Sequence, residues 1–257
     1  MNYHWNWRIF WETNPEGTGT FMSSLMSGLG WTLATALCAW ALALAMGIVV
    51  GAVRTTTLRW AVRLGNLYVE LFRNIPLLVQ MLLWYFVLPE LLPTAWGDAL
   101  KQLPDSQFYT AVVCLAFYMA ARVAEQVKAG IQALPRGQAM AASAMGLTLP
   151  QAYRFVLLPQ ALRIVMPPLS SDFLNTIKNT SVALTIGLME LTARTRAMES
   201  YTSQVFESFA AASIIYIVVN VTVVQAMRWL EHKLSVPGLI GTGVSANAGV
   251  NPGAAGH

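Results

Sequence analysis

The sequence predicts an all-α, polytopic membrane protein with five transmembrane helices, and three observations lead to that expectation. Hydrophobic residues make up 56% of the 257 residues. Charged residues make up only 11%, whereas a soluble domain usually carries about a quarter, because a hydrated surface needs charge that lipid excludes. The chain also contains long apolar runs, and the one from Gly17 to Val53 has no charged residue at all. A bilayer-crossing helix needs about 20 such residues.

Each of the five expected helices rests on one mainly apolar run. The fourth run contains Pro167 and Pro168, which remove backbone donors and are expected to kink the helix. The expected spans are Leu25–Val53, Leu67–Leu88, Phe108–Gln132, Ala161–Glu190 and Ser208–Leu230.

Charged residues between these runs predict the orientation. Lysine and arginine collect after the first, third and fifth runs, and acidic residues predominate after the second and fourth. Because positive loops stay in the cytoplasm, the N-terminus is expected outside and the C-terminus inside. We divide the chain into an N-terminal periplasmic or interfacial segment (1–24), a membrane domain (25–232) and a cytoplasmic tail (233–257). The tail is small and polar, and we expect most of it to be disordered.

Several function classes are excluded by composition. The basic residues are spread along the chain rather than gathered in a patch, which argues against nucleic-acid binding. The three histidines and two cysteines form no metal-ligand pattern, so no metal or cofactor is expected. No lysine follows a glycine, so the chain has no phosphate-binding loop of the Gly-x4-Gly-Lys type. No set of nucleophile and base suggests a catalytic site.

The segment between the third and fourth runs predicts two short helices. Gln138 to Met145 is rich in alanine and methionine, which favour helix, and Gly146 suits the left-handed position just after a helix end. Thr148 and Gln151 have capping-box spacing for a second helix, which Pro159 is expected to end. The small residues Ala141, Ala142 and Gly146 would let another protein approach this loop closely.

Polar residues inside the fourth run form the second candidate site. Ser171, Asp172, Asn175, Lys178 and Asn179 recur at spacings of three and four, which places them on one helical stripe. Ionisable groups at membrane depth usually face a bundle interior or a water-filled path. Two interpretations stay open. Asp172, Asn175, Lys178 and Asn179 line a translocation path in which Lys178 attracts an anion, or Asp172 and Lys178 neutralise each other or contact a partner subunit.

Three other ionisable residues are given structural roles. Arg73 is expected to anchor the end of its helix by snorkelling rather than to contact a substrate. Glu125 and Lys128, next to Arg122, are interpreted as a solvated or loop-facing turn.

The loop also carries a family resemblance. It resembles the Glu-Ala-Ala-x3-Gly-x9-Ile-x-Leu-Pro loop of ABC importer permeases, although a methionine stands in place of the glutamate and a valine in place of the isoleucine. The resemblance implies that the loop docks on a separate ATP-hydrolysing subunit and transmits its closure. The matching residues are Met140, Ala141, Ala142, Gly146, Val156, Leu158 and Pro159.

Other segments narrow the resemblance to the polar amino-acid importer permeases. The stretches 68–80, 134–138, 146–153 and 178–184 all resemble that family, and most closely its glutamate/aspartate importers. The resemblance implies a multi-pass permease in a bacterial inner membrane that imports acidic amino acids. It also implies an ATP-binding ABC subunit, a second permease chain that is different from this one, and a periplasmic substrate-binding protein as partners.

Three alternatives remain at the level of the sequence. The same type of permease would import another polar amino acid, such as glutamine, histidine or arginine. A membrane-embedded enzyme would need a convergent catalytic set, and a channel would leave the two-helix loop unexplained. Whether the two permease chains are identical is also open.

Overall fold

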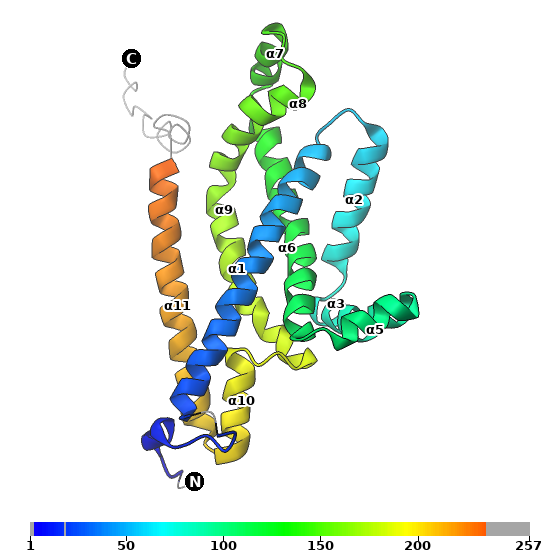
Figure 1. Cartoon of the computed structure of the whole chain (residues 1–257). Helices are drawn as coiled ribbons and strands as arrows, with labels where there is room; N and C mark the ends of the chain where they lie inside the picture. Colours follow the sequence, from blue (N-terminus) through cyan, green and yellow to red (C-terminus); the bar gives the residue numbers. More distant parts are fainter. Residues whose placement is uncertain (1–2, 18, 235–257) are drawn as a thin grey trace, which may run out of the picture.

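The structure is a computed structural model that describes residues 3–17 and 19–234. Within these residues the regular secondary structure is helical, apart from one isolated bridge between Thr13 and Thr20. The longest helices run roughly along the length of the molecule, with α2 beside them and the short helices α3 to α5 turned to one side (Figure 1). The helices are α1 (Phe21–Val53), α2 (Arg59–Asn74), α3 (Leu77–Leu82), α4 (Leu88–Leu91), α5 (Thr94–Gln102), α6 (Ser106–Ala133), α7 (Arg136–Ala144), α8 (Leu149–Ala152), α9 (Leu158–Asn179), α10 (Leu191–Thr202) and α11 (Val205–Leu234).

Helices α1 and α6 form the centre of the bundle and pack against each other through small residues. A Cβ added to Gly47 would lie 2.5 Å from the Cβ of Val123 and 2.9 Å from the carbonyl oxygen of Ala120. One added to Gly51 would lie 2.8 Å from the carbonyl oxygen of Ala124. Glycines four residues apart therefore let the two backbones approach closely, as is common where helices associate without a hydrophobic driving force.

The second expected helix is not one helix, so the prediction of a continuous Leu67–Leu88 span is wrong. Helix α2 ends at Asn74, and the chain turns by 101° before the next helical segment. Pro76 explains the break, because it lacks an N–H and keeps Ile75 in an extended conformation. The side chain of Gln80 donates from Nε2 to the carbonyl oxygens of Phe72 at 2.8 Å and Ile75 at 2.9 Å.

The fourth expected helix, Ala161–Glu190, is also interrupted. Helix α9 begins earlier, at Leu158, and continues through Pro167 and Pro168 to Asn179. A 3-10 helix (Thr180–Ile186) follows, and Gly187 then takes a left-handed φ of 86° before α10 begins. The other three expected helices are present with somewhat longer bounds as α1, α6 and α11.

Length and composition support part of the expected span count. Among the described residues, α1, α6 and α11 are long and apolar enough to cross a membrane, and α2 with the helices up to Leu91 would count as a fourth span if the bent pair is taken together. Helix α9 has sufficient length but a more polar composition. The count of five spans and their orientation stay predictions.

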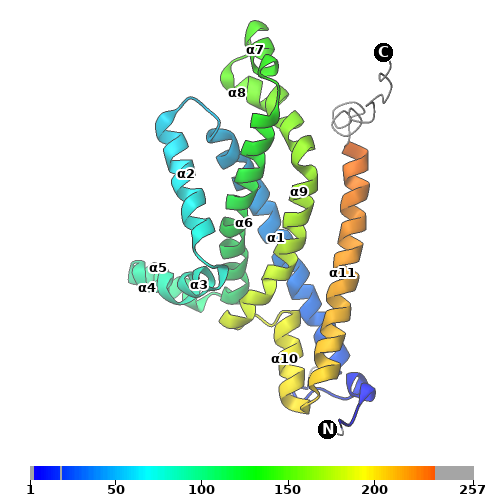
Figure 2. The same ribbon diagram turned by 180° about the vertical axis from the view of Figure 1, so that it is seen from behind.

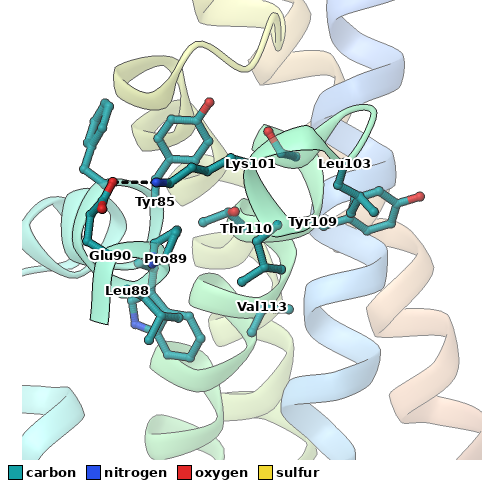
Figure 3. A pocket seen from close by; sticks show the side chains of 13 residues that line it. Tyr85, Leu88, Pro89, Glu90, Lys101, Leu103, Tyr109, Thr110 and Val113 are labelled. Carbon is teal, nitrogen blue, oxygen red and sulfur yellow. Dashed lines mark hydrogen bonds and ion pairs between the residues drawn. The ribbon is translucent and has the colours of Figure 1, made fainter. Parts of the chain in front are cut away.

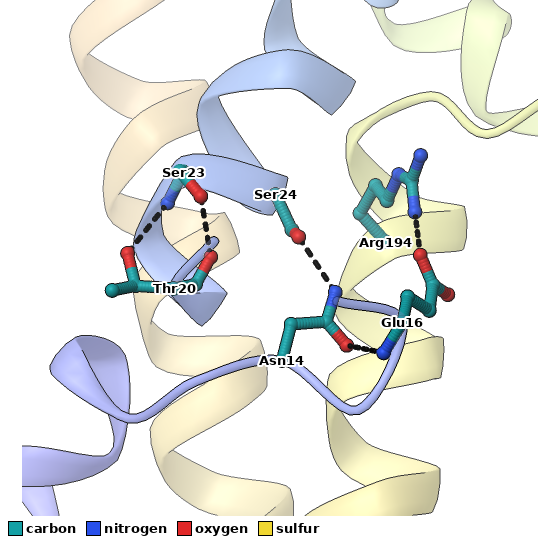
Figure 4. A network of polar contacts seen from close by, with 6 residues as sticks. All are labelled: Asn14, Glu16, Thr20, Ser23, Ser24 and Arg194. Carbon is teal, nitrogen blue, oxygen red and sulfur yellow. Dashed lines mark hydrogen bonds and ion pairs between the residues drawn. The ribbon is translucent and has the colours of Figure 1, made fainter. Parts of the chain in front are cut away.

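Polar contacts hold the N-terminal segment onto α1 and α10 (Figure 4). Asn14 donates from Nδ2 to Ser24 Oγ at 2.8 Å, and Arg194 of α10 forms an ion pair with Glu16 at 2.6 Å. Thr20 caps α1 by accepting from the backbone N–H of Ser23. At the other end of the chain, the expected tail lies outside the described residues, except that α11 continues to Leu234.

Candidate functional site

The first candidate site is the pair of short helices α7 and α8, which project from one end of the molecule (Figure 1). Helix α7 ends in a Schellman motif, because the N–H of Gly146 bonds to the Ser143 carbonyl at 3.0 Å and the N–H of Leu147 to the Ala142 carbonyl at 3.1 Å. Gly146 has a φ of 78°, which favours glycine. The two helices and the glycine turn expected here are therefore present.

The second helix starts as expected but does not end at Pro159. The N–H of Thr148, the N-cap residue of α8, donates to Gln151 Oε1 at 2.8 Å. Beyond α8 the chain continues through a π-helical turn, Tyr153–Leu157, directly into α9. Pro159 lies in the first turn of α9, where its missing N–H costs little. The π turn is wider than an α-helical turn, so the ring of Pro159 has room beside the preceding carbonyl groups. In a regular α-helix a proline ring would clash with them.

The outer surface of the helix pair differs from the expected smooth face of small residues. Ala142 is buried, so it is not available to another protein, whereas Ala141 and Gly146 are exposed. Val156, Leu158 and Pro159 are half-buried where the pair joins α9. What the surface does present is a set of large apolar side chains, which we call the apolar tip: Met140, Met145, Leu149 and Phe155. Met145, the most exposed of them, shows 79% of its surface.

One hydrogen bond links the helix pair to the centre of the bundle. The hydroxyl groups of Tyr153 in the π turn and Thr55 at the end of α1 lie 3.0 Å apart. Thr55 also donates to the carbonyl of Ala52. The link connects the base of the helix pair to the helix that packs along α6.

The second candidate site is the polar stripe of α9, and the structure divides it. Asp172 is buried against α6, whereas Ser171 and Lys178 are exposed and Asn175 and Asn179 are half-buried. Asp172 does not pair with Lys178, so the suggestion that these two neutralise each other is wrong. Its partner is Arg122 of α6, with 3.3 Å between Nη1 and Oδ1.

The solvated-turn interpretation of Glu125 is also wrong. Its carboxylate forms an ion pair with Arg54, the residue that follows α1, at 2.6 Å and a longer one with Arg73 of α2 at 3.7 Å. Arg54 is buried and also donates to Asn66 of α2 at 2.8 Å. Arg73 therefore contacts a carboxylate of α6, which the snorkelling interpretation did not anticipate.

Arg122 and Glu125 stand three residues apart on α6 and so are neighbours on one side of the helix. Their partners come from α2 on one side and α9 on the other, and these three helices lie side by side in Figure 2. We call this surface the charged helix face and define it by Arg73, Arg122, Glu125 and Asp172. The sequence signal for it was available, because Arg122 and Glu125 fall inside the apolar run Phe108–Gln132.

A separate cavity of about 320 Å³ lies beside α5 (Figure 3). Aromatic side chains of the π turn Leu83–Val87 line one side, and Tyr109 and Thr110 of α6 lie on another. Lys101 forms an ion pair with Glu90 at 2.6 Å in its lining, and this hydrogen bond raises the pKa of Lys101. The cavity does not include any residue of the charged helix face.

No metal site accompanies these features. Within residues 3–17 and 19–234, no group of three or more histidine, cysteine, aspartate or glutamate side chains is arranged to hold a metal ion.

Long apolar helices with a projecting helix pair place the chain in the class of helical membrane proteins. Residues 43–236 match the family "Binding-protein-dependent transport system inner membrane component", and the chain belongs to that family. It is 45% identical over 244 residues to the glutamate/aspartate import permease protein GltJ of Escherichia coli (strain K12), covering 94% of this chain and 99% of the relative.

Solved structures agree with the assignment. The chain of a structure described as "Crystal structure of an amino acid ABC transporter with histidines" has a TM-score of 0.70 and 30% identity, covering 83% of this chain and 95% of that one. A methionine ABC transporter, MetNI, in an inward-facing conformation has a TM-score of 0.71 at 20% identity, covering 84% and 98%, and shares the fold.

Proposed function

We propose that the chain is a membrane-spanning permease subunit of an ATP-driven importer for glutamate and aspartate. The observation that carries this proposal is the 45% identity to the glutamate/aspartate permease, which extends over nearly the whole length of both chains. The proposal includes a bacterial inner-membrane location with the N-terminus outside, a separate ATP-binding subunit, a second and different permease chain, and a periplasmic substrate-binding protein.

The helix pair α7–α8 is proposed to dock on the ATP-binding subunit. The apolar tip supports this role, because large exposed methionine, leucine and phenylalanine side chains at the end of a helical projection suit insertion into an apolar groove on a partner. Met140 takes the position of the family's usual glutamate and contributes an apolar contact there instead of a charge. The continuous path from α8 through the π turn into α9 would transmit movement of the tip to the bundle.

The charged helix face is proposed to line the translocation path. Arg73, Arg122 and Glu125 keep 53%, 44% and 35% of their side-chain surface exposed. Charges at membrane depth are expensive in contact with lipid and are found facing bundle interiors or water-filled cavities. This surface is therefore expected to face the second permease chain across the path. Lys178, Asn175 and Asn179 would lie in the same path, with Lys178 attracting the acidic side chain of the cargo.

Coupling is tested by replacing Gly146. Gly146→Leu forces a branched side chain into a left-handed conformation and should distort the turn between α7 and α8. We expect at least a tenfold loss of substrate-stimulated ATP hydrolysis in the reconstituted complex, equivalent to about 1.4 kcal/mol of activation free energy, with normal membrane insertion. Gly137→Ala is the matched control, since a Cβ at Gly137 meets nothing within 4 Å and φ is not positive.

The cargo is tested separately by uptake into proteoliposomes that contain the full complex and its binding protein. Uptake of glutamate and aspartate, with glutamine, histidine and arginine transported poorly, is the expected result. Preferred uptake of one of those three amino acids would refute the acidic assignment while leaving the importer role intact. Absence of ATP-dependent uptake of any amino acid would refute the importer role.

A further inference from the structure

The pair formed by Arg122 and Asp172 joins α6 to α9 in the middle of the charged helix face. We propose that these two side chains bind the backbone head group of the transported amino acid, with Arg122 taking its α-carboxylate and Asp172 its α-ammonium group. The inference rests on the proposed function as an amino-acid importer, but not on which amino acid is carried.

The pair is incompletely satisfied as it stands. Charge-assisted N–H···O bonds are typically about 2.7–2.9 Å long, whereas Arg122 Nη1 and Asp172 Oδ1 are 3.3 Å apart. Asp172 has only 6% of its surface exposed, and its second oxygen, Oδ2, has no hydrogen-bond partner in the described part of the chain. The other polar neighbours of this carboxylate, Gln126 and Asn175, are neutral amides. The buried carboxylate thus retains capacity for a second cationic donor.

Arg122 likewise has N–H donors that remain available for a ligand. Its guanidinium carries five N–H donors in a planar fork, which matches a carboxylate in a bidentate arrangement. Only the one bond to Asp172 engages it among the described residues, and 44% of the side chain is exposed. A free carboxylate arriving along the charged helix face would therefore reach Arg122 before it reached Asp172.

Charge balance favours a zwitterion over other ligands. A carboxylate alone would take Arg122 away from Asp172 and leave a buried aspartate without its counter-ion, which is strongly unfavourable. An ammonium group alone would leave Arg122 unpaired. An amino-acid head group brings one charge of each sign, so that the two protein charges and the two ligand charges are all paired after the exchange. The chemistry that fits the site is a free α-amino acid.

The position of the pair separates recognition of the head group from recognition of the side chain. Lys178 stands six residues after Asp172 on α9, a distance of about 9 Å along the helix axis, and it is exposed. The cargo's side chain would extend toward Lys178 while its head group is held between α6 and α9. Arg122 and Asp172 would then serve any amino acid, and Lys178 would select among them.

The experiment measures binding to the detergent-solubilised complex of both permeases and the ATPase, without binding protein, by equilibrium dialysis. The ligands are L-glutamate, glutarate, which lacks the α-ammonium group, and 4-aminobutyrate, which lacks the α-carboxylate. Each charged group recognised by a hydrogen-bonded partner should change affinity by at least about tenfold. We therefore expect the wild-type complex to bind glutarate and 4-aminobutyrate at least that much more weakly than glutamate.

Two variants assign the contacts. Asp172→Asn should remove the preference for glutamate over glutarate, and glutarate should bind at least as tightly as to the wild type because no buried aspartate loses its counter-ion. Arg122→Gln should remove the preference for glutamate over 4-aminobutyrate, and 4-aminobutyrate should bind at least as tightly as to the wild type because no arginine is left unpaired. Lys101→Gln, which removes an exposed ion pair beside the separate cavity, is the matched control and should bind all three ligands as the wild type does.

Three results would overturn the proposal. One is equal affinity of the wild type for glutamate and glutarate, which requires no variant to fold. The second is an Asp172→Asn complex that still discriminates these ligands as the wild type does. The third is an equal loss of affinity for all three ligands in both variants. If uptake shows a different cargo, the acidic assignment fails on its own, and the same comparison is made with that amino acid and its deaminated analogue.

Discussion

Replacing Gly47 with alanine would place one methyl group at the closest contact between α1 and α6. The added Cβ would lie 2.5 Å from Val123 Cβ and 2.9 Å from the Ala120 carbonyl oxygen. Both atoms belong to or adjoin the α6 backbone, so neither can rotate away. The two helices would have to move apart along a contact that continues to Gly51.

Two opposing effects set the magnitude. Overpacking a close contact costs about 1–3 kcal/mol, and contacts more than 1 Å inside van der Waals distance belong at the upper end. Alanine gains about 1 kcal/mol over glycine in a helix interior. The net loss for Gly47→Ala is therefore about 2 kcal/mol. Gly30→Ala on the same helix meets nothing within 4 Å, and it should gain up to about 1 kcal/mol.

The assay is thermal unfolding of the purified complex in one detergent, comparing the Gly47→Ala and Gly30→Ala variants with the wild type. Gly47→Ala should unfold at a lower temperature and Gly30→Ala at the same or a higher temperature. Adding Val123→Ala to Gly47→Ala should recover part of the loss, because it removes the branched methyl groups that the new Cβ meets. Equal stability of the two single variants would refute the close-packing argument.

Two further substitutions test polar contacts that hold the helices together. Arg54→Met removes the buried arginine that lies 2.6 Å from the half-exposed Glu125 and should lower stability by about 1.5–3 kcal/mol, as the loss of a hydrogen bond to a charged group does. Arg73→Gln, which breaks the longer and exposed contact, should cost less than about 1 kcal/mol. The thermal shift should rank the two variants in that order, and the reverse ranking would contradict the assignment of Glu125 to Arg54. Gln80→Met leaves the carbonyls of Phe72 and Ile75 without their side-chain donor and should cost about 1–3 kcal/mol. Unchanged amide exchange at the break between α2 and α3 would show that Gln80 does not stabilise it.

The loop was the most predictable part of the chain because its signals are local. The φ of Gly146 and the cap made by Thr148 and Gln151 depend on residues within one or two helical turns, and the structure has both. The expected end of the second short helix at Pro159 is wrong, because a proline does not always end a helix. Pro159 instead lies in the first turn of α9, because the π turn before it makes room for a residue without an N–H.

The charged helix face could be predicted only in part. Asp172 belongs to the polar stripe of α9, whose spacing is visible in the sequence and which predicts an ionisable group at membrane depth. The partners were not predictable, because Arg122 is 50 residues from Asp172 and no local rule relates such distant positions. The same limit applies to Arg54 and Glu125, whose pairing depends on how α1 packs against α6.

The π-helical turns have a consequence for the lengths that related chains can have. Leucine-proline pairs follow both of them, at Leu88-Pro89 and Leu158-Pro159, and in each case the leucine N–H bonds to the carbonyl five residues earlier. A π turn holds one residue more than the α-helical turn that it replaces. Deleting one residue from Tyr153–Leu157 would therefore restore a regular turn with little rotation of α8 relative to α9, because the extra residue is held within one turn. Pro159 would then stand inside a regular helix, where its ring clashes with the carbonyl four residues earlier, so related chains are expected to gain or lose the extra residue and the proline together.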